Sequence, residues 1–151
     1  MRIEHVPVFY PPPHNATISR MAQLLGIDYG KKRVGIALSD DAQKIALPHV
    51  ILENDPTLFP RIIDIIRKRD IEGIVVGESR DLRGVPNPLM KEISSFAQEL
   101  GEKARLPVHF EPEFLTSREA RTMRVGTGPV DASAAAIILQ SFIDKKENKG
   151  L

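Results

Sequence analysis

Four acidic residues stand where the chain is expected to pass from one element of secondary structure to the next. Asp28 ends an apolar run, Glu78 and Glu113 each follow another, and Asp131 opens the last helical segment. Carboxylates that converge repel one another unless a divalent cation neutralises them, and Mg²⁺ and Mn²⁺ favour such oxygen ligands. Two such ions would support hydrolysis of a phosphodiester bond. Taken singly, each acid also suits a turn or a helix cap, so the hypothesis depends on the set.

The apolar pattern predicts the elements that would position these acids. Five strands are expected at 24–28, 34–39, 45–52, 74–77 and 106–110, and four helices at about 58–69, at 89–101, from Thr116 onward and at 131–144. Pro48 indicates that the third strand lies at an edge. This order predicts an α/β fold with a mixed five-stranded sheet and helices on both faces.

The connections decide which acids could meet. If the first helical crossover returns strand 74–77 beside strand 24–28, Asp28 and Glu78 lie at adjacent carboxyl ends, which is where sites form in sheets of this kind. Glu113 would arrive there from the fifth strand and Asp131 from the last helix. The spacing therefore predicts an acidic edge.

Composition excludes several classes of protein. The 151 residues include no Cys, which excludes a disulfide scaffold, a zinc–thiolate site and a cysteine nucleophile. No apolar run approaches the roughly 20 residues that cross a bilayer, and no signal peptide is evident, so we expect a cytoplasmic protein without a membrane partner. Lys and Arg number 21 against 20 Asp and Glu, so any surface for nucleic acid must be local.

The two ends of the chain differ from its middle. Residues 1–20 hold four of the twelve prolines and no sustained periodicity, which indicates a disordered leader, and Met21 is a candidate for the true start. Residues 145–151 are polar and are expected to fray. The folded domain is therefore expected to span residues 21–144.

Five short motifs, in order along the chain, resemble those of the YqgF/RuvX family. They are LGIDYG at 25–30, KRVGIALSD at 32–40, VVG at 75–77, LTSREA at 115–120 and VDASAAAIILQ at 130–140. The resemblance covers about residues 21–144. It implies an RNase H-like fold, related to the RuvC resolvases. It also implies a nuclease that depends on Mg²⁺ or Mn²⁺ and acts on structured RNA, at the 5′ end of pre-16S rRNA, or on branched DNA such as a Holliday junction.

The resemblance assigns site residues one by one. The acid of the family's first strand corresponds to Asp28, that of its last helix to Asp131, and that of its Asp-Glu-Arg motif to Glu113. Pro112 and Phe114 replace the Asp and Arg of that motif, where Glu111 is a candidate substitute for the Asp, and Glu78 stands where the family usually has Leu. Either Glu78 or Glu113 could therefore complete the metal site. A non-catalytic nucleic-acid-binding protein with a relic acid cluster is the alternative in another class.

Basic residues near the acids are candidates for phosphate contacts. Three on the last-but-one helix recur every third residue and share a side, although a solvated helix face explains that spacing equally well. The candidates are Lys31, Lys32, Arg33, Arg80, Arg83, Arg118, Arg121 and Arg124. A nucleotide-binding fold of the sugar-kinase type shares the first motif, but it requires two related domains and the chain is too short. Monomer and homodimer both remain open.

Overall fold

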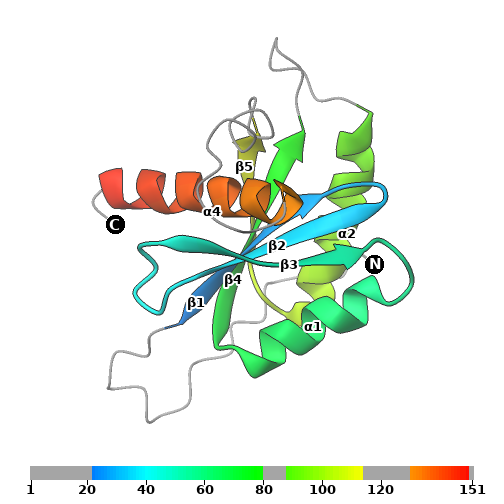
Figure 1. The fold of residues 1–151 in the computed structure, drawn as a ribbon, viewed down its shortest axis with the longest axis horizontal. Coiled ribbons are helices and arrows are strands. Elements are labelled where there is room, and N and C mark those ends of the chain that lie inside the picture. The colour runs from blue at the N-terminus through cyan, green and yellow to red at the C-terminus, as the bar shows by residue number, and fades with distance from the viewer. Residues whose placement is uncertain (1–21, 80–87, 114–129, 150–151) are drawn as a thin grey trace, which may run out of the picture.

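The computed structural model describes residues 22–79, 88–113 and 130–149. Five strands form one sheet in the order β3-β2-β1-β4-β5 (Figure 1). They are β1 (Gln23–Tyr29), β2 (Arg33–Ser39), β3 (Ala46–Glu53), β4 (Ile71–Ser79) and β5 (Val108–Glu113). β2 pairs antiparallel with both β1 and β3, whereas β4 pairs parallel with both β1 and β5. The predicted mixed five-stranded sheet is confirmed, and the strand that contains Pro48 lies at an edge.

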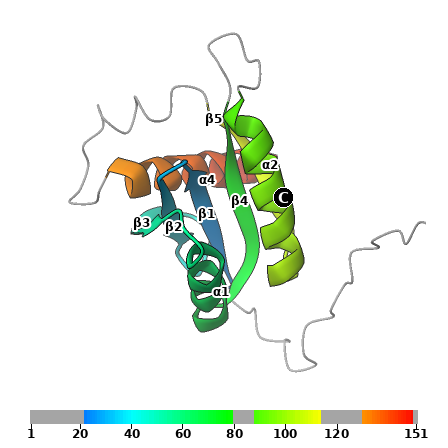
Figure 2. The same ribbon diagram turned by 90° about the vertical axis from the view of Figure 1, so that its right-hand side faces the viewer.

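Helices cover both faces of this sheet, as predicted. α1 (Leu58–Lys68) and α2 (Leu89–Ala104) lie on one face, and α4 (Val130–Asn148) lies on the other (Figure 2). The helix predicted from Thr116 and the leader predicted at residues 1–20 lie outside the described residues. Within the described ranges, no helix is long and apolar enough to cross a membrane.

The alternation of side chains along each strand assigns them to one of two cores. Leu25 and Ile27 of β1 join the cluster that includes Ile62 of α1 and Leu100 of α2. Leu24, which alternates with them, joins the cluster formed with Leu139 of α4. Burying each such side chain stabilises the fold by roughly 1.5–3 kcal/mol. Even-numbered residues of β1 therefore face α4, and odd-numbered residues face α1 and α2.

Gly26 lets α4 approach β1 closely. A Cβ atom built on Gly26 would lie 2.7 Å from the Cβ of Leu139 and 3.0 Å from the carbonyl oxygen of Ala135. Both distances are too short for an ordinary carbon contact, so any larger residue would push the helix away. The small side chain of Ala135 serves the same approach from the helix side.

Two helices run further than the sequence predicts. α2 passes through Gly101 and ends at Ala104, because Gly101 packs against Val108 of β5, where an added Cβ would lie 3.0 Å from Cγ2, rather than breaking the helix. α4 continues to Asn148, so residues 145–148 are not the frayed tail expected from their polarity. Lys145 forms an ion pair with Glu111, which anchors this last turn.

Candidate functional site

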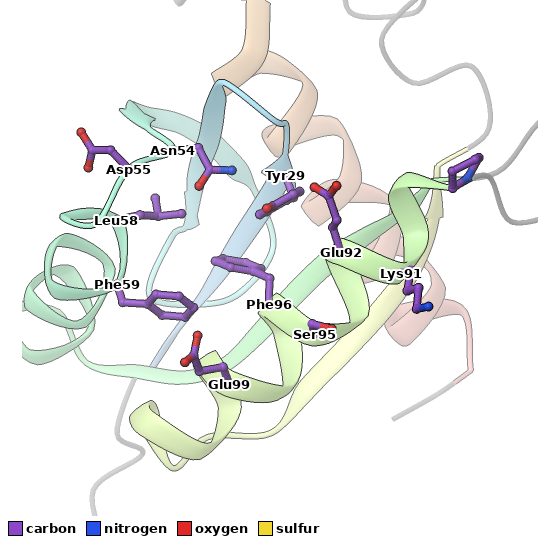
Figure 3. A pocket seen from close by; sticks show the side chains of 11 residues that line it. Tyr29, Asn54, Asp55, Leu58, Phe59, Lys91, Glu92, Ser95, Phe96 and Glu99 are labelled. Carbon is purple, nitrogen blue, oxygen red and sulfur yellow. The ribbon is translucent and has the colours of Figure 1, made fainter.

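Asp28 lies at the carboxyl end of β1, on the face of the sheet that α4 covers. Leu24 and Gly26 both contact α4, and Asp28 is the next residue in that alternation. Tyr29, on the opposite face, packs its ring 4.8 Å from the ring of Phe96 in α2 (Figure 3). Tyr29 is partly buried and packs against the core on this face.

The pocket beside Tyr29 has a volume of about 760 Å³ and lies between α1 and α2. Its aromatic wall is formed by Tyr29, Phe59 and Phe96, as Figure 3 shows, and Asp55 and Glu92 are at its rim. Hydrogen bonds from the side chain and backbone of Thr57 lower the pKa of Asp55. This carboxylate therefore stabilises the start of α1. The pocket lies on the face of the sheet away from Asp28.

Glu78 does not join Asp28, although β4 lies beside β1 as predicted. Within β4, Ile74 and Val76 belong to the core under α1 and α2, whereas Val75 belongs to the core under α4. β4 runs on to Ser79, so the alternation continues and assigns Glu78 to the α1–α2 face. The two acids end adjacent strands, but they lie on opposite faces of the sheet.

β5 places residue 113 on the same face as Asp28. The register pairs Gly77 with Glu111 and Ser79 with Glu113. The ring of His109 lies 5.0 Å from the ring of Phe142 in α4, and Glu111 is hydrogen-bonded to α4, so residues 109 and 111 share the α4 face and position 113 is the next in this alternation. The sequence predicts that this strand ends at 110, but it includes position 113 as its last residue.

Asp131 is the second residue of α4, and the helix begins toward the carboxyl end of β1. Gln140 bonds to the backbone of Lys44 and Ala46, close to where β1 starts, whereas Ala135 lies against Gly26 in the middle of β1. Going back along α4 thus means going forward along β1. Position 131 lies one turn of helix, about 6 Å, before Ala135.

The turn between β1 and β2 carries three cationic residues directly after Asp28. Lys31, Lys32 and Arg33 are exposed there. Gly30 fits because a Cβ would lie 2.5 Å from the carbonyl oxygen of Arg33. Asn54 fixes the turn from the neighbouring loop: its side-chain Nδ2 donates to the carbonyl oxygen of Gly30 (2.8 Å) and its backbone N–H to that of Lys32 (2.9 Å). Sequence reasoning missed this role and treated Asn54 only as a loop residue.

The remaining basic candidates, Arg80, Arg83, Arg118, Arg121 and Arg124, lie outside the described residues. They stay predictions.

A second residue that the sequence did not single out for its contacts is Glu111. It is 3% exposed, yet it is charged. Ser141 Oγ donates a hydrogen bond to its Oε1 (2.9 Å), and Lys145 Nζ forms an ion pair with the same oxygen. Both partners belong to α4. Glu111 is therefore held by two side chains of the helix.

The strand alternation thus assigns Asp28 and Glu78 to opposite faces of the sheet. Among the residues whose side chains the structure describes, no three His, Cys, Asp or Glu are close enough to hold a metal ion together. β1 and β5 end at the same edge of the sheet, and α4 covers the face to which Asp28 belongs. Three carboxylates from three elements would form an oxygen-rich donor set, which suits a hard divalent cation.

Comparison with known proteins shows which proteins this chain is similar to. The family model described as "RuvX: Holliday junction resolvase" matches residues 22–145. A Rickettsia felis protein named "Putative pre-16S rRNA nuclease" is 32% identical over 154 residues, which cover 95% of this chain and 97% of the relative. A Rickettsia canadensis protein of the same name is 33% identical over 132 residues, which cover 81% of this chain and 86% of the relative.

A solved structure is similar in fold. Thermus thermophilus RuvC in complex with a Holliday junction substrate superimposes with a TM-score of 0.56 at 15% identity, covering 83% of this chain and 96% of RuvC. At this identity the likeness concerns the fold, which is RNase H-like as predicted.

Proposed function

Because the chain belongs to the RuvX family, we propose that it is a metal-dependent nuclease that processes the 5′ end of the precursor of 16S rRNA. Family membership supports the hydrolysis of phosphodiester bonds. The curated relatives that match almost the whole chain carry the name of a pre-16S rRNA nuclease, which supports the choice of RNA.

The observation that carries the proposal is the position of Asp28 near the end of β1, on the face that α4 covers. Position 113, the last of β5, and position 131, the second of α4, belong to the other two elements at this face, which supports Glu113 and Asp131 as its partners. Glu113 rather than Glu78 completes the set, because the alternation along β4 assigns Glu78 to the opposite face. The sequence alone left these two alternatives open.

The proposed ligands suit Mg²⁺ or Mn²⁺. Asp28, Glu113 and Asp131 would supply only carboxylate oxygens, which these hard cations prefer. When bound, two such cations activate a water molecule and stabilise the leaving oxygen of the scissile phosphodiester. The role of the chain is to hold the three carboxylates on elements that the sheet and α4 keep in place. Lys31, Lys32 and Arg33, on the turn after Asp28, would contact substrate phosphates and set its orientation.

A four-way DNA junction is the second candidate substrate. The family model is described as a Holliday junction resolvase, and the RuvC structure holds such a junction. The chemistry would be the same for both substrates, because each reaction is the hydrolysis of a phosphodiester bond. Only the shape of the bound nucleic acid would differ.

Cleavage of two labelled substrates tests the proposal. A 16S 5′-leader RNA and a four-way DNA junction are each incubated with Mg²⁺, Mn²⁺ or EDTA, using wild type, Asp28→Asn and Asp41→Asn. Asp41 is an exposed acid near the opposite end of β1, so its variant is the matched control. We expect RNA cleavage that requires metal, is lost in Asp28→Asn and is retained in Asp41→Asn.

Each other outcome has a definite meaning. Cleavage of the junction alone would keep the chemistry and change the substrate. Binding of either nucleic acid without any cleavage would replace the proposed nuclease with a binding protein.

A further inference from the structure

The proposed ligands lie on three elements, β1, β5 and α4, and each pair of these elements is held together by contacts. The contacts of two pairs follow directly from the fold. β1 and β5 are connected through the hydrogen-bonded ladders of β4, which pairs with both. β1 and α4 are connected by the close approach at Gly26, against Ala135 and Leu139. The contacts of the third pair, α4 and β5, would fix Asp131 relative to Glu113.

The contact between α4 and β5 is made largely by one buried charge. Glu111 of β5 accepts a hydrogen bond from Ser141 and forms an ion pair with Lys145, both on α4. The side chain of Glu111 is only 4% exposed, while that of Lys145 is 54% exposed and reaches in from the surface. The nearby rings of His109 and Phe142 add an apolar contact. We call Glu111, Ser141 and Lys145 the clamp.

Apolar packing and a polar clamp constrain a helix differently. The hydrophobic effect is non-directional, so burial of the apolar face of α4 does not by itself select one position of the helix along the sheet. A hydrogen bond to a fixed carboxylate oxygen is directional and admits only one position of the helix. Buried ion pairs add little net stability, because desolvation offsets their attraction, and setting one arrangement of the parts is a role that they can serve instead.

We propose that Glu111 is a positioning residue, which acts through Ser141 and Lys145 to hold the start of α4 in register with the end of β5. This inference rests on the proposed function, since it concerns the spacing between Asp131 and Glu113. Glu111 precedes Glu113 by two residues on the same face, and β5 has β4 as its single hydrogen-bonded neighbour in the described sheet. The clamp is the polar contact that connects the edge strand β5 to α4.

The test replaces the clamp by apolar side chains. In the triple variant Glu111→Met, Ser141→Ala, Lys145→Leu, no buried charge is left unpaired. Apolar replacement of a buried ion pair commonly leaves a protein as stable or more stable. We expect the thermal unfolding midpoint to stay at or above that of wild type. Binding of Mn²⁺, measured by electron paramagnetic resonance, should weaken about tenfold, as on losing residues that support metal ligands.

Two further variants make the result decisive. Leu100→Val, in the core under α1 and α2, lowers stability without touching α4 or β5 and is the control for a purely structural effect. Glu111→Gln keeps an acceptor for Ser141 but removes the charge that pairs with Lys145. It should also weaken Mn²⁺ binding, and it serves if the triple variant does not fold.

The outcomes separate the clamp from the proposed function. Unchanged Mn²⁺ affinity in the folded clamp variants, beside a clear loss in Asp28→Asn, would overturn the positioning role and leave the metal site intact. Equal loss of stability and affinity in the clamp variants and in Leu100→Val would also overturn it. If wild type and Asp28→Asn bind Mn²⁺ equally, the proposed metal site itself is wrong, and the clamp falls with it.

Discussion

The two faces of the sheet are packed against their helices through different kinds of contact. Under α1 and α2 the core consists of large side chains such as Ile27, Ile62 and Leu100, and it holds the ring pair of Tyr29 and Phe96. Under α4 the core also holds large side chains such as Leu139, but it includes the close approach of Gly26 to Ala135 and adjoins the buried Glu111. The first face can supply most of the apolar burial. The second holds a helix close enough to bring a carboxylate to the end of β1.

This difference has a consequence for where function is sensitive to change. Large apolar side chains tolerate rearrangement because their burial depends on area and volume. A close approach of backbones and a directional hydrogen bond have no comparable tolerance. We therefore expect substitutions on the α4 face to reduce activity more than stability, and substitutions on the α1–α2 face to do the opposite.

The largest difference in cleavage rate is expected between two variants, each of which replaces one acid on one face of the sheet. Losing a supporting residue around a metal costs about 10–100-fold, so Glu113→Gln, which removes a proposed ligand, should lower the cleavage rate at least about 100-fold. Glu78→Gln changes an acid of the opposite face, and the rate should stay within about threefold of wild type, as for most substitutions away from a site. The rates are measured with saturating Mg²⁺ on the same RNA.

The reverse result would mean that the ligand lies on the α1–α2 face and not on the α4 face. A large loss in Glu78→Gln with little change in Glu113→Gln would mean that the second ligand comes from β4 and that the alternation argument fails. Equal stability of both variants, measured by urea denaturation, ensures that the rates reflect the site.

A smaller effect is expected from Gly26→Ala. The added methyl group would meet Leu139 at 2.7 Å and the Ala135 carbonyl oxygen at 3.0 Å, so α4 must move. Overpacking of this kind costs about 1–3 kcal/mol, and a displacement of about 1 Å at a catalytic group can cost up to about 100-fold in rate. Unfolding in urea and the cleavage rate measure the two effects.

Gly73→Ala is the matched control, because the added Cβ would meet only the end of the Leu24 side chain, at 3.2 Å. Gly73→Ala should lower the stability and the cleavage rate less than Gly26→Ala does. If Gly26→Ala lowered stability but left the rate of the folded protein unchanged, the position of α4 would not limit activity.

The sequence predicts the mixed five-stranded sheet because each strand is a short apolar run between turn residues. It could not assign a face to Glu78, because Ile74, Val75 and Val76 are all buried, and a strand buried on both sides shows no alternation. The face became clear only from the helices that pack on each side. Asp28 was identifiable from the motif around it, and the direction of its side chain followed from Gly26.

Contacts between distant parts of the chain were beyond the sequence. Glu111 and Lys145 are 34 residues apart, and nothing in the composition of either segment indicates that they pair. Gly101 shows the same limit locally: a glycine near the end of a helical pattern usually marks its end, but this one is required for contact with Val108. In both cases the decisive partner comes from packing, which a linear pattern does not contain.

The smallest effect is expected at Asp40, in the turn between β2 and β3, which belongs to neither face. Its Oδ1 accepts hydrogen bonds from the backbone N–H groups of Ile45 (3.0 Å) and Lys44 (2.7 Å), and these bonds hold the pKa of Asp40 below its usual 3.8. Because the folded state binds the proton less readily than the unfolded state, this contribution to stability is complete above pH 3.8 and declines as the pH falls through the lowered pKa. Asp40→Ala should therefore be slightly less stable than wild type at neutral pH.

The difference between Asp40→Ala and wild type should narrow below pH 3.8, measured as the urea midpoint at a series of pH values. Asp41→Ala, which changes the exposed neighbour, is the control and should follow the wild-type profile. A difference that persists unchanged into strong acid would assign the effect to the shape of the turn rather than to the charge of Asp40. Cleavage activity at neutral pH should be the same in all three proteins, because this turn lies at the end of β1 opposite to Asp28. A loss of activity in Asp40→Ala or Asp41→Ala would contradict the assignment of function to the α4 face at the carboxyl end of β1.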